Sequence, residues 1–224
     1  VMTHRLLVVG DNHGDVESLR TVLDEVQSDS FDYVVHVGDF TNAWRTAKQT
    51  ENETKGKKRG AAQLRQVEPV LEEFDTLAEH GLVWVYGNQD YFGALEYDLS
   101  VGTRLPEDDV VTVGDLRFTN SLDHVTDDVV LVTHMAYWRL TDQFDGLAHF
   151  CGNSHRGRHK ACRLNSAFLQ VRDPETDQKQ FGGYFVVELS DSSGLDVEMR
   201  SIGTLSRIEC DRHAERGVQF QPDT

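Results

Sequence analysis

The sequence contains few cysteines, and their spacing suggests no structural role. Cys151, Cys162 and Cys210 are too few and too irregular for a disulfide scaffold or a zinc cluster. A thiol-based phosphatase is disfavoured as well, because a phosphate-cradling loop that ends in arginine follows none of them. Cysteine chemistry is therefore not the expected basis of any activity.

Long hydrophobic runs are also missing. No run approaches the roughly 20 apolar residues that span a bilayer, and no signal peptide precedes Leu6. Neither G-x-x-x-x-G-K-[ST] nor G-x-G-x-x-G occurs, which argues against the nucleotide-binding loops of those types. We expect a soluble cytoplasmic protein without a membrane partner. Its length of 224 residues suits a single domain over residues 1–208, followed by a polar, flexible tail over residues 209–224.

Positive charge is scarce. Lys and Arg total 22 against 38 Asp and Glu, which gives a net charge of −16. Such a field repels phosphates, so broad electrostatic binding of nucleic acid is disfavoured. An acidic, lysine-poor composition is typical of a halophilic source, and an ordinary acidic protein is the alternative.

One basic segment interrupts this acidic chain. Residues 42–60 are polar, and the sequence predicts a loop there that carries Lys55, Lys57, Lys58 and Arg59. The loop is either a lid whose cations meet a substrate phosphate or a solvated surface loop.

Hydrophobic periodicity predicts an α/β fold. Apolar runs typical of buried strands alternate with amphipathic helical segments in the first half, and the second half is richer in strands. Gly114-Asp115 lies between two short apolar segments, as in a β-hairpin. The predicted strands are 6–9, 33–37, 82–86, 110–113, 116–119, 129–132, 147–151, 161–165, 183–189 and 195–202, and the predicted helices are 16–26 and 64–78.

Five polar motifs follow predicted strands in a fixed order. They are G-D-N-H-G-D at 10–15, G-D-F at 38–40, G-N-Q-D at 87–90, the lone His134, and G-N-S-H at 152–155. Open α/β sheets build ligand sites at the carboxyl ends of strands. Asp11 and Asp39 alone could be helix caps and His134 a core histidine, but that reading does not explain Asn88 and His155. Asp and His together suit Mn²⁺, Fe²⁺ or Zn²⁺.

The ordered motifs resemble those of the calcineurin-like metallophosphoesterases, over about residues 5–190. The resemblance implies a layered α/β-β/α sandwich with two facing mixed β-sheets and a metal site at the strand carboxyl ends. It also implies a first metal bound by Asp11, His13 and His155, with Asp39 bridging to a second metal. The second set is Asn88, His134 and Asn153, and Asp39, Asn88 and His134 form the catalytic core.

This chain departs from the family pattern at two positions. Asn153 stands where the family has a histidine ligand, and an amide oxygen binds Mn²⁺ or Zn²⁺ weakly beside a neutral imidazole. Gln89 stands where the family has a histidine that protonates the leaving group, and an amide cannot act as that acid. His124 is the best candidate to replace it. We expect Asp90 to make a supporting hydrogen bond and His36 to point away from the metals.

Two adjacent cations can polarise a phosphoryl group and generate hydroxide from water. The expected cofactors are therefore two divalent metal ions, Mn²⁺ above all, with Zn²⁺, Fe²⁺, Ni²⁺ or Mg²⁺ as alternatives. The predicted function is hydrolysis of a phosphomonoester or phosphodiester, in a small phosphate ester or nucleotide, by in-line attack of a metal-bound hydroxide. The alternative is a catalytically weakened, metal-binding scaffold with a protein partner, because Gln89 and Asn153 are the kind of losses that accompany such a change.

Overall fold

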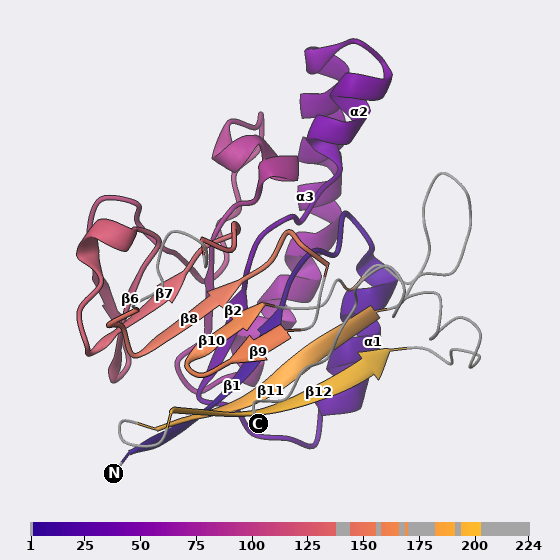
Figure 1. The fold of residues 1–224 in the computed structure, drawn as a ribbon. Coiled ribbons are helices and arrows are strands. Elements are labelled where there is room, and N and C mark those ends of the chain that lie inside the picture. Colours follow the sequence, from indigo (N-terminus) through magenta and orange to yellow (C-terminus); the bar gives the residue numbers. More distant parts are fainter. Residues whose placement is uncertain are drawn as a thin grey trace.

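Two mixed six-stranded sheets form the centre of the protein in the computed structural model, which describes residues 2–137, 144–155, 158–165, 169, 182–190 and 194–202. The first sheet has the order β12-β11-β1-β2-β3-β4, and the second has the order β5-β6-β7-β8-β10-β9 (Figure 1). The strands of the first sheet are β1 (Thr3–Val9), β2 (Tyr33–His36), β3 (Leu82–Trp84), β4 (Thr103–Arg104), β11 (Gly182–Ser190) and β12 (Gly194–Ile202). Those of the second are β5 (Val111–Val113), β6 (Leu116–Thr119), β7 (Val129–Val132), β8 (Ala148–Cys151), β9 (Arg158–Lys160) and β10 (Arg163–Asn165).

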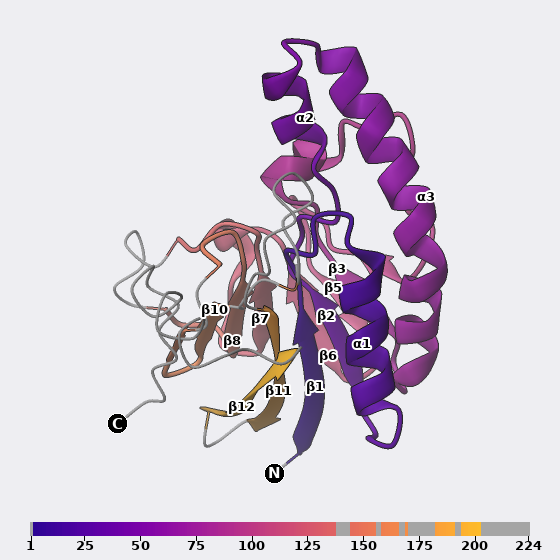
Figure 2. The ribbon, with the colours of Figure 1, turned by 90° about the vertical axis from the view of Figure 1, so that its right-hand side faces the viewer.

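The first sheet is buried on both faces, which explains its unbroken apolar runs. Along β1, Leu6 and Val8 belong to the core between the two sheets, whereas Leu7 and Val9 belong to the core beneath the helices. Successive side chains of a strand point to opposite faces, so one strand contributes to both cores. Figure 2 shows α1 (Val16–Val26) and α3 (Glu53–Leu77) on the outer face of this sheet and the second sheet on its other side.

The two facing mixed sheets confirm the fold predicted from the sequence. Antiparallel pairing of β5 with β6 confirms the hairpin around Gly114. The short strands β4 and β9 were not predicted, and residues 161 and 162, expected in a strand, form the turn before β10. The predicted tail at 209–224 lies outside the described residues.

The predicted loop at 42–60 is wrong. Its residues form α2 (Ala43–Gln49) and the first turns of α3, whose first turn is capped by the Asn52 side chain accepting from Lys55 N at 3.0 Å. The two helices pack so closely that a Cβ on Gly56 would lie 2.5 Å from Ala47 Cβ. These helices lack the periodic apolar residues from which a helix is predicted, and the close packing of α2 on α3 stabilises them instead. The resulting helical arm, α2 with the first half of α3, projects beyond the end of the sheets (Figure 1).

None of the helices in the described part of the chain combines the length and hydrophobicity that crossing a membrane requires.

Candidate metal centre

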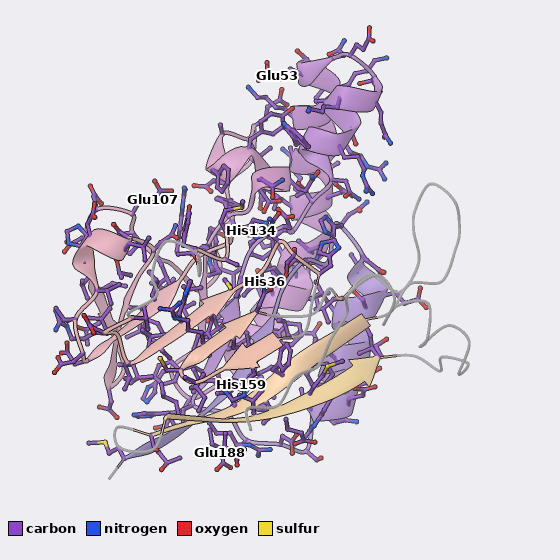
Figure 3. All side chains as sticks on the ribbon, viewed as in Figure 1. His36, Glu53, Glu107, His134, His159 and Glu188 are labelled. Carbon is purple, nitrogen blue, oxygen red and sulfur yellow. The ribbon has the colours of Figure 1, made fainter. Side chains whose placement is uncertain are left out.

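The carboxyl ends of five strands converge at one end of the sandwich. β1, β2 and β3 run parallel in the first sheet, and β7 and β8 run parallel in the second. Figure 3 places His134 at the end from which the helical arm projects. A hollow of about 170 Å³ lies there, and its walls contain predicted ligands from both sheets. It is lined by His13, Asp39, Asn42, Arg45, Asn88, Gln89, Asn153 and His155.

Backbone hydrogen bonds between the loops fix this arrangement. Asp11 N donates to Gly38 O at 2.9 Å, and His13 N donates to Asp39 O at 3.0 Å, which joins the first two loops. Gly152 N donates to His134 O at 3.0 Å, which joins the loops after β7 and β8. The ligand-bearing loops therefore hold one another in place.

The first predicted ligand set is assembled by the fold. His13 Nε2 and His155 Nε2 lie 2.9 Å apart, and His155 Nε2 lies 3.3 Å from Asp11 Oδ1. These three residues form a group whose ligand atoms all lie within 4.8 Å of one another. Burial lowers the pKa of His13 and keeps its imidazole neutral, the form that binds metals. Although burial opposes it, the hydrogen bond to His155 and the nearby histidines hold the pKa of Asp11 below its usual range, so its carboxylate is ionised.

The second set presents three acceptor atoms to one point. His134 Nδ1 donates to the carbonyl of Val37 at 2.8 Å, so the lone pair of its Nε2 is directed at the site when the ring is neutral. That Nε2 lies 2.9 Å from Asn88 Oδ1 and 3.2 Å from Asp39 Oδ2. Acceptors at such distances repel unless a proton or a metal ion lies between them.

The pKa of His134 is raised by the same neighbouring groups. Burial alone would lower the pKa, but the hydrogen bond to Asp39 and the charges of Asp11 and Asp39 outweigh burial and raise it to about 9. Without a metal the imidazole is therefore protonated at neutral pH, and its Nε2 faces Asp39 Oδ2 and Asn88 Oδ1.

Asp39 lies between the two sets. Its Oδ1 accepts from Gln89 N at 2.8 Å, while its Oδ2 lies 3.2 Å from His134 Nε2 and 3.9 Å from His13 Nε2. A second group with ligand atoms within 4.8 Å joins Asp39 and His134 to Asp11, so Asp11 is common to both groups. The two carboxylates thus connect the two sets.

The ligand residues have unusual backbone conformations. Several non-glycine residues there lie in the left-handed region, which L-amino acids seldom adopt and which clusters at functional sites. The sequence motifs gave no sign of this strain, although they contain the glycines that flank it. The residues are Asp11 (φ 51°), His13 (φ 48°), Asp39 (φ 57°), Asn153 (φ 67°) and His155 (φ 52°).

Two motif glycines make room for the carboxylates. A Cβ at Gly87 would lie 2.1 Å from Asp39 Oδ1, and a Cβ at Gly152 would lie 2.4 Å from Asp11 Oδ2. Any side chain at either position would displace a predicted ligand. The glycines that precede Asn88 and Asn153 therefore leave the space that the carboxylates of Asp39 and Asp11 occupy.

Asp90 supports the site from below, in the role expected for it. Its buried carboxylate accepts from Phe40 N at 3.1 Å, Thr41 N at 2.9 Å and Gly87 N at 3.0 Å. These bonds join the loops after β2 and β3. Burial, reinforced by the charge of Asp39, raises the pKa of Asp90 to about 7.

His36 lies beneath the metal centre, as predicted. Its Nδ1 accepts from Gly38 N at 3.1 Å, its Nε2 lies 2.8 Å from Asn12 Oδ1, and its ring stacks on Phe40. Burial lowers the pKa of His36 to about 3, so the ring is neutral and structural.

Of three other residues singled out in the sequence, two line the hollow and one does not. Asn153 lines the hollow, and its backbone N donates to Asp11 Oδ1 at 3.0 Å. Gln89 also lines it, and its Oε1 accepts from Arg45 N at 3.0 Å. His124 ends the short helix η2 (Leu122–His124), is exposed, and is not part of the lining of the hollow.

A cationic side chain of the site, Arg45, was not predicted from the sequence. Arg45 on α2 lines the hollow, whereas Lys55, Lys57, Lys58 and Arg59 do not. Lys57 instead pairs with Glu53 at 2.8 Å. Prediction of a helix directly after Asp39 could have identified Arg45, because the first turn of α2 lies next to the predicted metal ligands. Asn42, also missed, lines the hollow and its Nδ2 donates to His13 O at 2.8 Å.

Comparison with known proteins agrees with this fold. The sequence model of calcineurin-like phosphoesterases matches residues 4–184, and the chain belongs to that family. It is therefore a metal-dependent phosphoesterase by family. Curated protein sequences contain no significant match.

Solved structures share the architecture at low identity. TT1561 of Thermus thermophilus is 10% identical, with coverage of 88% of this chain and 99% of that chain and a TM-score of 0.50. A metallophosphoesterase from Sphaerobacter thermophilus is 14% identical, with coverage of 97% and 96% and a TM-score of 0.44. Wild-type Vps29 from Entamoeba histolytica complexed with Zn²⁺ is 15% identical, with coverage of 89% and 99% and a TM-score of 0.46. At these identities the likeness concerns the fold alone.

Proposed function

We propose that this protein hydrolyses phosphate esters with two divalent cations, Mn²⁺ foremost, bound between the two sheets. The observation that carries the proposal is the convergence of three potential ligand atoms, because His134 Nε2 lies 2.9 Å from Asn88 Oδ1 and 3.2 Å from Asp39 Oδ2. The mixture of imidazole, amide and carboxylate suits a metal ion of intermediate hardness.

The two ligand sets differ in strength. Asp11, His13 and His155 offer one carboxylate and two imidazoles, whereas Asn88, His134 and Asn153 offer two weakly binding amides. We assign Asp39 to both sets, because its Oδ2 faces His134 and His13. The first set should therefore hold its metal more tightly than the second.

Bound by these residues, the cations would supply Lewis acidity toward the phosphoryl oxygens and would lower the pKa of the attacking water. The residues of this chain position the ester. The Arg45 guanidinium, at the rim of the same hollow, offers a charge-assisted donor to a phosphate oxygen. Gln89 cannot protonate the leaving oxygen, so esters with acidic leaving groups should react faster than alkyl esters.

The first test is hydrolysis by the purified protein after metals have been removed and returned singly. p-Nitrophenyl phosphate and bis(p-nitrophenyl) phosphate should be cleaved with at least one of Mn²⁺, Zn²⁺, Ni²⁺ or Mg²⁺. Asp39→Asn should lose about 100-fold or more, equivalent to roughly 2.7 kcal/mol of transition-state stabilisation. The amide removes a charge that both ligand sets use, while circular dichroism should show an unchanged fold.

The matched control is Asp24→Asn, which makes the same change on the exposed face of α1. It should keep the parent activity. If Asp39→Asn remained within about tenfold of the parent, the reaction would occur elsewhere. If neither ester were cleaved with any metal, the scaffold function suggested by Gln89 and Asn153 would be favoured.

A further inference from the structure

A second cavity adjoins the metal centre at His134. Its volume is about 400 Å³, and His134 is one of its lining residues. The same imidazole faces Asn88 and Asp39 of the metal centre. The volume falls within the range of about 300–1,000 Å³ that is typical of small-molecule sites. Because His134 lines this cavity and contacts Asn88 and Asp39, which line the metal hollow, one ligand can extend from the hollow into the cavity.

Two exposed aromatic side chains line the second cavity. Phe92 is 51% exposed and Tyr137 is 38% exposed, and in the described part of the chain only Met2 and Trp44 are comparable large exposed hydrophobic residues. Exposed rings beside a cavity offer flat surfaces on which a planar group can stack.

The backbone at Phe92 is strained. Tyr91 has φ 52° and Phe92 has φ 49°, both in the left-handed region, within the short helix η1 (Asn88–Gly93) that begins with a predicted metal ligand. Bulky residues adopt this region at a cost of roughly 1–3 kcal/mol, and such strain clusters at ligand sites. Phe92 N donates to Gly87 O at 3.0 Å, which fastens the strained turn to the third metal-binding motif. The backbone of Phe92 is thus held next to the third motif, beside the candidate metal centre.

The cavity also has a polar side. Asn120 and Ser121 line it together with Glu107, and Asn120 N donates to Pro106 O at 2.9 Å, which brings these segments side by side. The Asn120 amide has both donors and an acceptor, and the Ser121 hydroxyl can still donate a proton while its oxygen accepts from Asp123 N. Glu107 can only accept when ionised. Figure 3 shows Glu107 at the same end of the sandwich as His134, far from Glu188.

These features specify the chemistry of the ligand. Flat rings suit an aromatic group, and neighbouring donors and acceptors suit a ring with a hydrogen-bonding edge. The carboxylate of Glu107 repels a second phosphate and favours N–H groups. A simple acyl chain would leave the polar side without partners, at a cost in affinity.

We propose that the second cavity binds the base of a nucleoside, so that the phosphate esters cleaved by this protein are nucleotides. This inference rests on the proposed function and names its substrate class. The phosphate occupies the metal hollow, the sugar passes His134, and the base stacks on Phe92 or Tyr137 with its edge toward Asn120 and Glu107.

The test compares substrates that differ only in the base. Adenosine 5′-phosphate and ribose 5-phosphate have the same primary phosphomonoester, so a base site alone should separate their kcat/KM values. The corresponding diester pair is thymidine 5′-(p-nitrophenyl phosphate) and methyl p-nitrophenyl phosphate. The nucleoside ester should be preferred by roughly tenfold or more, as stacking of one base predicts. Phe92→Ala should reduce that ratio severalfold, whereas Trp44→Ala, at an exposed aromatic residue outside the cavity, should leave it unchanged.

Equal rates for both members of each pair would overturn the base site and leave the phosphoesterase function standing. If no ester of either kind were cleaved with any metal, the proposed function would fail instead. In that case, binding of adenosine to the metal-free protein, measured by ligand-observed NMR, tests separately whether the second cavity binds a base. Weaker binding of adenosine by Phe92→Ala than by the parent supports the base site. The base site is overturned if the parent does not bind adenosine, or if Phe92→Ala binds it with the parent affinity. Asn120→Ala provides the same comparison if Phe92→Ala does not fold.

Discussion

The strained ligand residues are stabilised before any metal arrives. Each left-handed residue costs about 1–3 kcal/mol, and the structure offsets that cost with hydrogen bonds between loops. His13, for example, donates its backbone N–H to Asp39 O and receives the Asn42 side chain on its own carbonyl. The donor atoms are therefore positioned by the fold rather than gathered by the cation, which lowers the entropy cost of binding.

The neutral buried histidines predict a loss of stability in acid. Burial, with a contribution from Arg163, lowers the pKa of His149 to about 3, and its Nε2 lies 2.8 Å from Thr133 Oγ1. The unfolded chain binds a proton near pH 6.5, whereas the folded chain does so only near pH 3. The stability from this residue is therefore complete above pH 6.5 and falls as the pH decreases toward 3, by up to about 1.4 kcal/mol per pH unit.

Denaturant unfolding of the metal-free protein between pH 7 and pH 4 measures this slope. His149→Asn should be less stable at pH 7 and should show a pH dependence smaller by up to one proton. His124→Gln, at an exposed histidine, should follow the parent curve. Parallel curves for His149→Asn and the parent would show that His149 has the same pKa in the folded and unfolded states, which would contradict the prediction.

The residues that the fold brings together could be predicted from sequence, because polar side chains that suit a metal follow apolar runs in every motif, four of which also contain glycine. Arg45 could not, because its place depends on α2, which has only two buried residues, Ala43 and Ala47. The strained backbone of Asp39 and His155 is likewise a product of loop–loop contacts between residues far apart in sequence.

The strands were easier to predict than the helices. Buried strands show unbroken apolar runs, and the predicted strands differ from the observed ones mainly at their ends. The first half of α3 contains Gly56 and Gly60 among charged residues, so its pattern indicated a loop. Those glycines lower helix propensity, yet they permit the contact with α2 that stabilises the arm.

This contact yields a prediction for the helical arm. Gly56→Ala improves helix propensity by about 1 kcal/mol, but the new Cβ would lie 2.5 Å from Ala43 O and 2.5 Å from Ala47 Cβ. Overpacking of this kind costs about 1–3 kcal/mol, so the thermal midpoint should fall rather than rise. Because α2 must move, activity toward phosphate esters should fall as well through displacement of Arg45.

Thermal unfolding and steady-state kinetics on the same preparations check both effects. Lys58→Ala, on the exposed side of the same helix, should change stability by less than about 0.5 kcal/mol. A higher melting temperature for Gly56→Ala would mean that the two helices separate without cost.

The net charge of the whole protein predicts that its thermal stability depends on salt concentration. A net charge of −16 repels itself in the compact state. Raising NaCl from about 0.1 M to about 1 M shortens the Debye length from about 10 Å to about 3 Å and screens this repulsion. The melting temperature of the metal-free protein should therefore rise with salt. Sucrose at equal osmolality does not screen charge, and an equal rise in sucrose would contradict the electrostatic explanation.

The order of the strands in the first sheet constrains how the protein is made. β1 lies between β2 and β11, but β11 (Gly182–Ser190) is translated long after β1 (Thr3–Val9). Until then, β1 has one unpaired edge, a known hazard for association with other chains. The ligands Asp11 and Asp39 also emerge from the ribosome well before His134 and His155. The proposed metal site is thus complete only late in synthesis, and ribosome-bound chains that end before β11 expose an edge of β1 to other chains.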